Sequence, residues 1–169
     1  NGRGVVLRSD VAGTDDSVDL QKVNALIFIT RRDDIIPALA RLSRAQAAAF
    51  FMLGESIETS AGDPTKAGQA KREVGTNPFI IGQEAEEGNR LLALLEQHRD
   101  IECYLLNTGR VGKSDLDDGA KLTIAHSTGL LREIARGTLT YERDPFWGYE
   151  VAVKGTDVNL KEVNPREFY

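Results

Sequence analysis

The stretch from Cys103 to Ser127 concentrates the residues of this chain whose types and spacing could bind an anion. A short apolar run, Tyr104 to Leu106, leads into a glycine-punctuated loop, Asn107 to Lys113, which carries a threonine, an arginine and a lysine. Order is expected to resume at Lys121 to Ile124, and a helix should begin near Ser127, with that serine as its N-cap. A strand that delivers a basic loop to a helix start is a suitable place for an anionic ligand.

The loop differs from the GxxxxGK[ST] phosphate loop of nucleotide-binding proteins. Gly109 and the run Gly112-Lys113-Ser114 resemble part of that motif, but the upstream glycine is missing. An ordinary surface loop explains the same residues, so the motif alone leaves both interpretations open.

Composition restricts the class of protein. The chain has 169 residues, which is enough for a single domain with a buried core. Its net charge of −5 and the absence of a clustered basic face argue against a nucleic-acid partner. No apolar stretch approaches the roughly 20 residues that span a bilayer, and no signal-peptide pattern opens the chain. We therefore expect a cytoplasmic protein without a membrane partner.

Two residues with reactive side chains are expected to serve structural roles. Cys103 is the only cysteine, which excludes an intramolecular disulfide, and its place at the start of an apolar run predicts a buried, inert thiol. His98 lies at the polar end of a predicted helix, where contact with the helix dipole is expected rather than metal ligation.

Apolar runs alternate with amphipathic segments, which predicts an α/β fold with a mixed β-sheet and flanking helices. The segments expected to be strands are Val5 to Leu7, Asn24 to Thr30 (covered on both faces), and a hairpin of Thr138 to Glu142 with Tyr149 to Val153. The expected helices are the one that follows the capping box at Ser43 and ends near Leu53, and those over Gln83 to His98 and Ser127 to Gly137. Between them, Glu55 to Pro78 is expected to form a long polar loop. The charged cluster Arg31 to Asp34 follows a predicted strand and is either a site candidate or a solvated turn.

Ten blocks spread over nearly the whole chain resemble, in order and spacing, the C-terminal part of ATP-dependent phosphoenolpyruvate carboxykinase. No single block is specific, but their order is hard to obtain by chance. They are Asn1 to Arg3, Ala25 to Thr30, Pro37 to Leu42 with the Ser43 helix, Phe51 to Gly54, Ala61-Gly62, Asn77 to Phe79, Tyr104 to Gly109, Gly119 to Ser127, Asp144 to Phe146 and Asn164 to Arg166.

The resemblance implies a function and a fragment. The family converts oxaloacetate and ATP into phosphoenolpyruvate, CO₂ and ADP, a step of gluconeogenesis, with Mg²⁺ and a transition metal such as Mn²⁺. Its phosphate loop, its metal ligands and most of its oxaloacetate-binding residues precede the matched region. Residues 1–169 are therefore expected to form one domain, the C-terminal fragment of a longer chain, which lines the nucleotide cleft and is inactive alone. Its expected partners are ATP, oxaloacetate or phosphoenolpyruvate, and the rest of its own chain.

Four residues acquire roles from the resemblance. Arg3 matches the arginine of an Asn-Thr-Arg block that contacts the terminal phosphate of ATP and the transferring group, a catalytic role suited to a guanidinium. Lys121 and Leu122 match an Arg-Ile pair that packs on adenine. Ser127 matches a threonine that hydrogen-bonds the base. No metal ligand is expected in this chain.

The chain departs from the family pattern at Glu58, Arg110, Lys121 and Thr128, where the family has lysine, tryptophan, arginine and arginine. Lysine cannot stack a planar guanidinium on the base. These departures indicate a distant subfamily and leave an alternative open, a catalytically silent nucleotide-binding or regulatory module on the same scaffold. A small stand-alone α/β protein with only structural similarity is the third interpretation.

Overall fold

A computed structural model describes residues 4–14, 17, 19–33, 36–58, 63–72 and 80–163, without the side chain of Glu162. The predictions for Asp34 and for the blocks Asn1 to Arg3, Ala61-Gly62, Asn77 to Phe79 and Asn164 to Arg166 fall outside these residues. The strands are β1 Ala25–Thr30, β2 Leu39–Leu42, β3 Glu55–Ile57, β4 Ala70–Arg72, β5 Glu102–Asn107, β6 Arg110–Val111, β7 Ala120–Lys121, β8 Thr140–Arg143 and β9 Glu150–Lys154. The helices are α1 Arg44–Leu53, α2 Glu84–Gln97 and α3 Ile124–Arg136, with short 3₁₀ turns at Arg8–Asp10, Pro64–Lys66 and Leu160–Val163.

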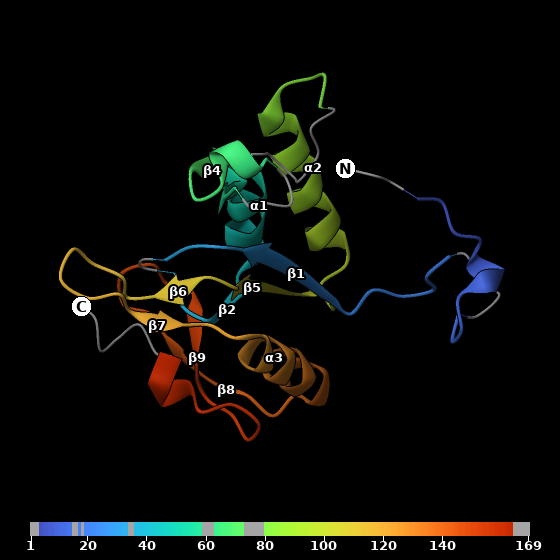
Figure 1. Ribbon diagram of the computed structural model, residues 1–169. Coiled ribbons are helices and arrows are strands. Elements are labelled where there is room, and N and C mark those ends of the chain that lie inside the picture. Colours follow the sequence, from blue (N-terminus) through green and yellow to red (C-terminus); the bar gives the residue numbers. More distant parts are fainter. Residues whose placement is uncertain are drawn as a thin grey trace.

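The central sheet confirms the predicted α/β fold with a mixed sheet. Within the described residues its strand order is β1-β5-β2-β9-β8. β1 runs parallel to β5, whereas β2 is antiparallel to both β5 and β9, and β8 forms the predicted hairpin with β9. Helices α1 and α2 cover one face of this sheet and α3 covers the other (Figure 1).

Alternate residues of the strands build one apolar cluster on each face, as a sheet of period two requires. In β5, Tyr104 and Leu106 point into the cluster that contains Leu130 of α3. Cys103 and Leu105 point into the cluster that contains Ala47 of α1 and Leu95 of α2. Cys103 is a free and buried cysteine, as predicted, and burial raises the pKa of its thiol, which disfavours the reactive thiolate.

β1 behaves in part as its sequence predicts. Ala25 and Ile27 pack on the α3 side and Leu26 and Phe28 on the α1–α2 side, so both faces of its first four residues are covered. Its outer edge meets no other strand of the described chain, because β1 is last in the order, and Ile29 is 67% exposed.

The predicted capping box opens α1. The Ser43 hydroxyl accepts a hydrogen bond from Gln46 N at 3.3 Å, and the Gln46 side chain accepts one from Ser43 N at 2.9 Å. The helix ends at Gly54, which adopts a left-handed φ of 56°. Helix α2 lies where its leucine pattern predicts, with His98 at its C-cap. The two helices approach closely at Gly88, because a Cβ there would meet the side chain of Met52.

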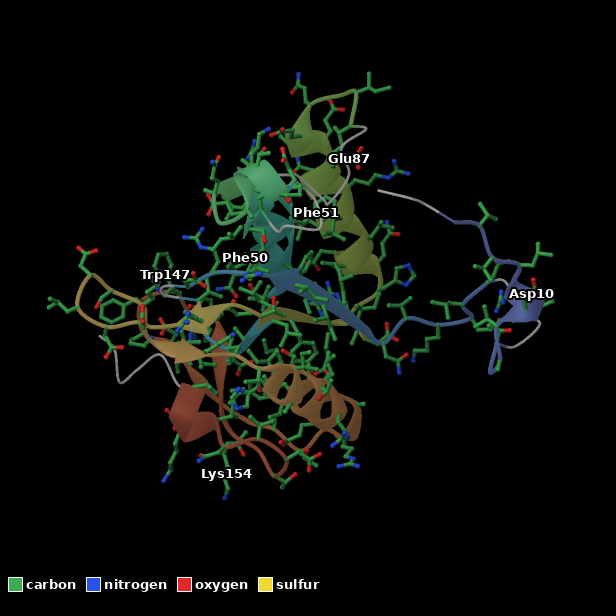
Figure 2. The ribbon with its side chains drawn as sticks, viewed as in Figure 1. Asp10, Phe50, Phe51, Glu87, Trp147 and Lys154 are labelled. Carbon is green, nitrogen blue, oxygen red and sulfur yellow. The ribbon has the colours of Figure 1, made fainter. Side chains whose placement is uncertain are left out.

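Two predictions for segments outside the central sheet were wrong. Val5 to Leu7 form no strand and are exposed, on an arm that leads away from the sheet; Asp10 marks this arm in Figure 2. An apolar run alone cannot form a strand without a neighbour to pair with. The polar segment after Gly54 is also more ordered than expected, because Glu55–Ile57 pairs antiparallel with Ala70–Arg72. Ion pairs support this hairpin, among them Glu58 with Lys71 at 3.2 Å.

None of the helices in the described ranges combines the length and apolar character that crossing a bilayer requires.

Candidate functional site

The carboxyl ends of β1 and β5 meet at one edge of the sheet, because the two strands are parallel neighbours in register from Ala25 with Glu102 to Thr30 with Asn107. Thr108 fastens the loops that follow, since its N–H and its hydroxyl both donate to Thr30 O, at 2.9 and 3.0 Å. Loops at the carboxyl ends of parallel strands are where α/β folds place ligands. The charged cluster after β1 and the basic loop after β5 therefore belong to one candidate site.

Asn107 organises this site. Its side chain is buried, with 1% of the residue exposed. The Oδ1 atom accepts hydrogen bonds from Arg32 N and Gly109 N, both at 3.0 Å. The Nδ2 group donates to Ile36 O at 3.0 Å and to Arg110 O at 2.9 Å. Both hydrogens and both acceptor positions of the amide are used, so Asn107 positions the loops and has no capacity left for a ligand.

Gly109 permits the close approach of the two loops. A Cβ at this position would collide with the carbonyl oxygen of Arg32, so no larger residue fits without backbone movement. Arg110 N donates to the same Arg32 O at 2.8 Å, and Leu122 N donates to Gly109 O at 2.9 Å. The second bond attaches the end of β7 to these loops. Hydrogen bonds thus join the loops after β1 and β5 and the end of β7 into one unit, which we call the loop block.

The glycine-rich loop is a β-hairpin and does not form a phosphate cradle. β6 and β7 pair antiparallel, with Arg110 opposite Lys121. Lys113 N donates to Asp33 O at 2.8 Å, and Ser114 N donates to Asp117 O at 2.9 Å. These N–H groups are therefore spent on the protein, which favours the ordinary surface loop for the stretch up to Ser114.

Helix α3 begins earlier than predicted. Its N-cap is Thr123, whose hydroxyl accepts from His126 N at 3.3 Å, while His126 Nδ1 accepts from Thr123 N at 3.2 Å. Histidine takes the place that Glu or Gln has in the usual capping box. Ser127 is thus a first-turn residue and not the N-cap, and its hydroxyl donates to Thr123 O at 3.3 Å.

The predicted adenine-contacting residues lie together at the β7–α3 junction. Lys121 is exposed at the end of β7, and Ser127 is half-buried on the first turn of the helix. Leu122, between them, is only 5% exposed and belongs to the core cluster under α3. The junction therefore presents one cation and one hydroxyl around a leucine that mainly fills the core. Arg3 lies outside the described residues.

Three of the four departures from the family pattern have local partners. Glu58 pairs with Lys71. Arg110 Nη1 donates to Asp118 O at 3.1 Å and closes the β6–β7 hairpin. Thr128 Oγ1 donates to Ile124 O at 2.9 Å within α3. These side chains are thus used within the two hairpins and the helix next to the site.

A cleft of about 380 Å³ opens beside the loop block and has mixed charge. Arg32, Asp33, Ser56 and Lys113 line it. Arg32 Nη1 is held by Glu55 Oε2 at 2.9 Å, so part of the positive charge after β1 is neutralised within the chain. Sequence reasoning could not find this pair, because the two residues meet only in the fold, where Thr30 Oγ1 donates to Glu55 O at 2.9 Å.

Over the residues that the structure describes, no group of three or more His, Cys, Asp or Glu side chains could hold a metal ion.

Comparison with known proteins gives a consistent result. A family model described as phosphoenolpyruvate carboxykinase matches residues 1–161. The chain is 35% identical to the phosphoenolpyruvate carboxykinase (ATP) of Aeropyrum pernix over its whole length, which covers 33% of that protein. It is 30% identical to the enzyme of the same name from Parvibaculum lavamentivorans, over 85% of this chain and 27% of the relative. The chain thus spans about a third or less of the length of these relatives.

Proposed function

Because the chain belongs to the ATP-dependent phosphoenolpyruvate carboxykinase family, we propose that it is the nucleotide-binding C-terminal part of an enzyme that converts oxaloacetate and ATP into phosphoenolpyruvate, CO₂ and ADP. The observation that carries the proposal is the block of β1, β5 and β7 tied through Asn107 and Gly109. It sets Lys121 and Ser127 at a common junction next to the carboxyl ends of two parallel strands. This edge suits a ligand in an α/β fold.

In this proposal the chain binds and orients the nucleotide. Ser127 is half-buried and carries a hydroxyl able to hydrogen-bond a base edge, while the exposed ammonium of Lys121 adds positive charge close by. Arg3 neutralises the charge that develops on the γ-phosphoryl group as the enolate oxygen attacks it in line. Mg²⁺ and Mn²⁺ are expected on ligands elsewhere in the longer protein, where they would polarise phosphate and enolate oxygens.

Exposed apolar surface supports the proposal that the domain is one part of a longer protein. Val5 is 98% exposed and Val6 and Leu7 are each 67% exposed, on the arm that precedes β1. The outer edge of β1 is also open in the described chain, beside an apolar groove of about 530 Å³ lined by Phe50 and Phe51. Folded proteins usually cover such surface. We infer that another part of the longer protein covers it.

A silent nucleotide-binding or regulatory module remains the second candidate. The observation that favours it is the local use of Glu58, Arg110 and Thr128, where the family has other residues. Their side chains support the fold at positions where other chemistry would be expected. A module of this kind would bind ATP without converting oxaloacetate.

Two variants and a matched control test the proposed roles in the intact protein. Ser127→Ala should weaken ATP binding about tenfold, the value of one lost hydrogen bond of roughly 1.4 kcal/mol. Lys154→Ala, at an exposed lysine of β9 on the far side from α2 (Figure 2), should leave ATP binding unchanged. Arg3→Ala should abolish turnover while ATP still binds. Unchanged turnover in Arg3→Ala, or equal losses in Ser127→Ala and Lys154→Ala, would refute these roles.

A further inference from the structure

The carboxylate of Glu133, on α3, lies outside the candidate site and is fully buried, with 0% of the residue exposed. Three backbone N–H groups of the loop after β9 donate to it. Oε1 accepts from Asp157 N at 2.7 Å and Val158 N at 3.2 Å, and Oε2 accepts from Thr156 N at 2.9 Å. A Cβ at Gly155 would meet the same carboxylate. Burying a carboxylate is costly unless hydrogen bonds compensate, so this group is built to hold one loop in one place.

The loop also packs along α3 toward the candidate site. Gly129 lies one helical turn before Glu133 on the same face of the helix, since residues four apart are neighbours. A Cβ at Gly129 would meet the side chain of Val158, so loop and helix approach closely there. Gly129 follows Ser127 by two residues. The loop therefore supports α3 within one turn of a residue assigned to the nucleotide.

The far end of the same segment packs against β7. The 3₁₀ turn Leu160–Val163, in red in Figure 1, follows the loop and lies next to this strand. Both end residues of the turn are buried in the apolar cluster that also contains Leu122. Residues 155–163 thus contact both α3, which carries Ser127, and β7, which carries Lys121. We call these residues the brace.

Glu133 itself does not reach the residues assigned to the nucleotide. It follows Ser127 by six positions, which places it about 9 Å farther along the helix at about 1.5 Å per residue. Any effect of Glu133 on a bound nucleotide must therefore pass through the placement of α3. That placement matters, because a hydrogen bond is lost when its donor and acceptor are separated by more than about 3.5 Å.

We propose that Glu133 is a positioning residue for the nucleotide. Through the brace it fixes α3 against β7, and so it sets the Ser127 hydroxyl at a defined distance from Lys121. An apolar side chain could fill the same space without the cost of a buried charge, so stability alone does not explain a carboxylate here. The inference rests on the proposed function, because it requires that the base binds at Ser127.

The test measures ATP binding to the intact protein by titration calorimetry in a double-mutant cycle. Glu133→Gln keeps the shape of the side chain but turns an amide toward the loop N–H groups. ATP binding should weaken severalfold, up to the roughly tenfold loss expected for Ser127→Ala. In the Ser127→Ala background, Glu133→Gln should have no further effect on ATP affinity, because the contact that it positions is already absent. A role in stability alone would lower affinity equally in both backgrounds.

A matched control and a second variant keep the test decisive. Glu86→Gln removes an equal charge from an exposed position of α2 and should leave ATP affinity unchanged. Val158→Ala removes the contact with Gly129 but keeps the carboxylate. It should also weaken ATP binding only while Ser127 is present, and it repeats the cycle if the unfolding temperature shows that Glu133→Gln is unstable.

Three results would overturn the inference: unchanged ATP affinity in Glu133→Gln, the same loss with and without Ser127, or an equal loss in Glu86→Gln. Failure of the proposed function looks different. In that case the wild-type protein would not bind ATP, or Ser127→Ala alone would leave the affinity unchanged, and the inference would fall with it.

Discussion

Replacing Glu133 by alanine should loosen the loop that follows β9. The Glu133 carboxylate is fully buried on α3 and accepts four hydrogen bonds. Oε1 accepts from Asp157 N at 2.7 Å and Val158 N at 3.2 Å, and Oε2 accepts from Thr156 N at 2.9 Å and Thr138 Oγ1 at 3.2 Å. A charged acceptor that receives several backbone N–H groups is a strong anchor.

The loss of stability in Glu133→Ala depends on whether water can replace the carboxylate as acceptor for each N–H group. Val158 is buried, so its N–H would lose its partner outright, which costs about 1–3 kcal/mol. Thr156 and Asp157 are exposed residues whose N–H groups water can reach, so losing the hydrogen bond of each should cost about 0.5–1.5 kcal/mol. The expected loss is about 4 kcal/mol. Glu133→Gln keeps one carbonyl acceptor but turns an amide toward Thr156 N–H, so about half of that loss is expected.

Hydrogen exchange of the loop amides is the direct assay. A local loss of about 4 kcal/mol should speed exchange at residues 156–158 about a thousandfold. Glu86→Ala removes an exposed carboxylate from the first turn of α2 and serves as the control, with a loss below about 1 kcal/mol. Unchanged exchange at these three amides in Glu133→Ala would refute the reasoning.

A cycle with Gly155 sharpens the test. A Cβ at Gly155 would meet the Glu133 carboxylate, so Gly155→Ala should destabilise the wild-type protein. In Glu133→Ala the same substitution finds open space and should cost less. Additive effects in the double variant would contradict the packing described here.

Three further outcomes follow from the structure. Gly88→Ala should push α1 from α2 at Met52 and lower the free energy of unfolding by about 1–3 kcal/mol in denaturant titrations; a neutral result would contradict the close helix contact. Gly109→Ala should impair ATP binding, because its Cβ would strike Arg32 O and separate the two loops, and calorimetry that finds wild-type affinity would exclude this. Burial raises the pKa of Tyr141 to about 12, so the folded state favours the neutral phenol. That stability is complete below the unfolded pKa of about 10 and is lost as pH rises toward 12, which unfolding curves for wild type and Tyr141→Phe should reveal; identical curves would contradict it.

The sequence predicted the elements whose signals are local. The Ser43 capping box and Gly54 delimit α1, and the leucine pattern of α2 places it within one residue. The start of α3 was missed because Thr123 and His126 form a box with histidine in place of the usual acid, while Ser127 looked like the better cap. A Thr-x-x-His signal could have found it.

The rest depends on which strands become neighbours, which no local pattern encodes. Asn107 could be named as part of a loop, but its bonds to Arg32 N and Ile36 O exist only because β5 lies beside β1 and β2. The apolar run at Val5 predicted a strand, yet pairing needs a partner that the described chain does not supply. A cavity at the amino end of β5 likewise takes its walls from three segments that are distant in the sequence.

The most direct measurement of the central claim is the stoichiometry of oxaloacetate conversion by the intact protein, with CO₂, ADP and phosphoenolpyruvate quantified in one reaction. The proposed function predicts the three products in equal amounts, strictly dependent on ATP. CO₂ release without ADP, or ATP binding with no conversion of oxaloacetate, would contradict the carboxykinase assignment, and the second result would favour the silent nucleotide-binding module.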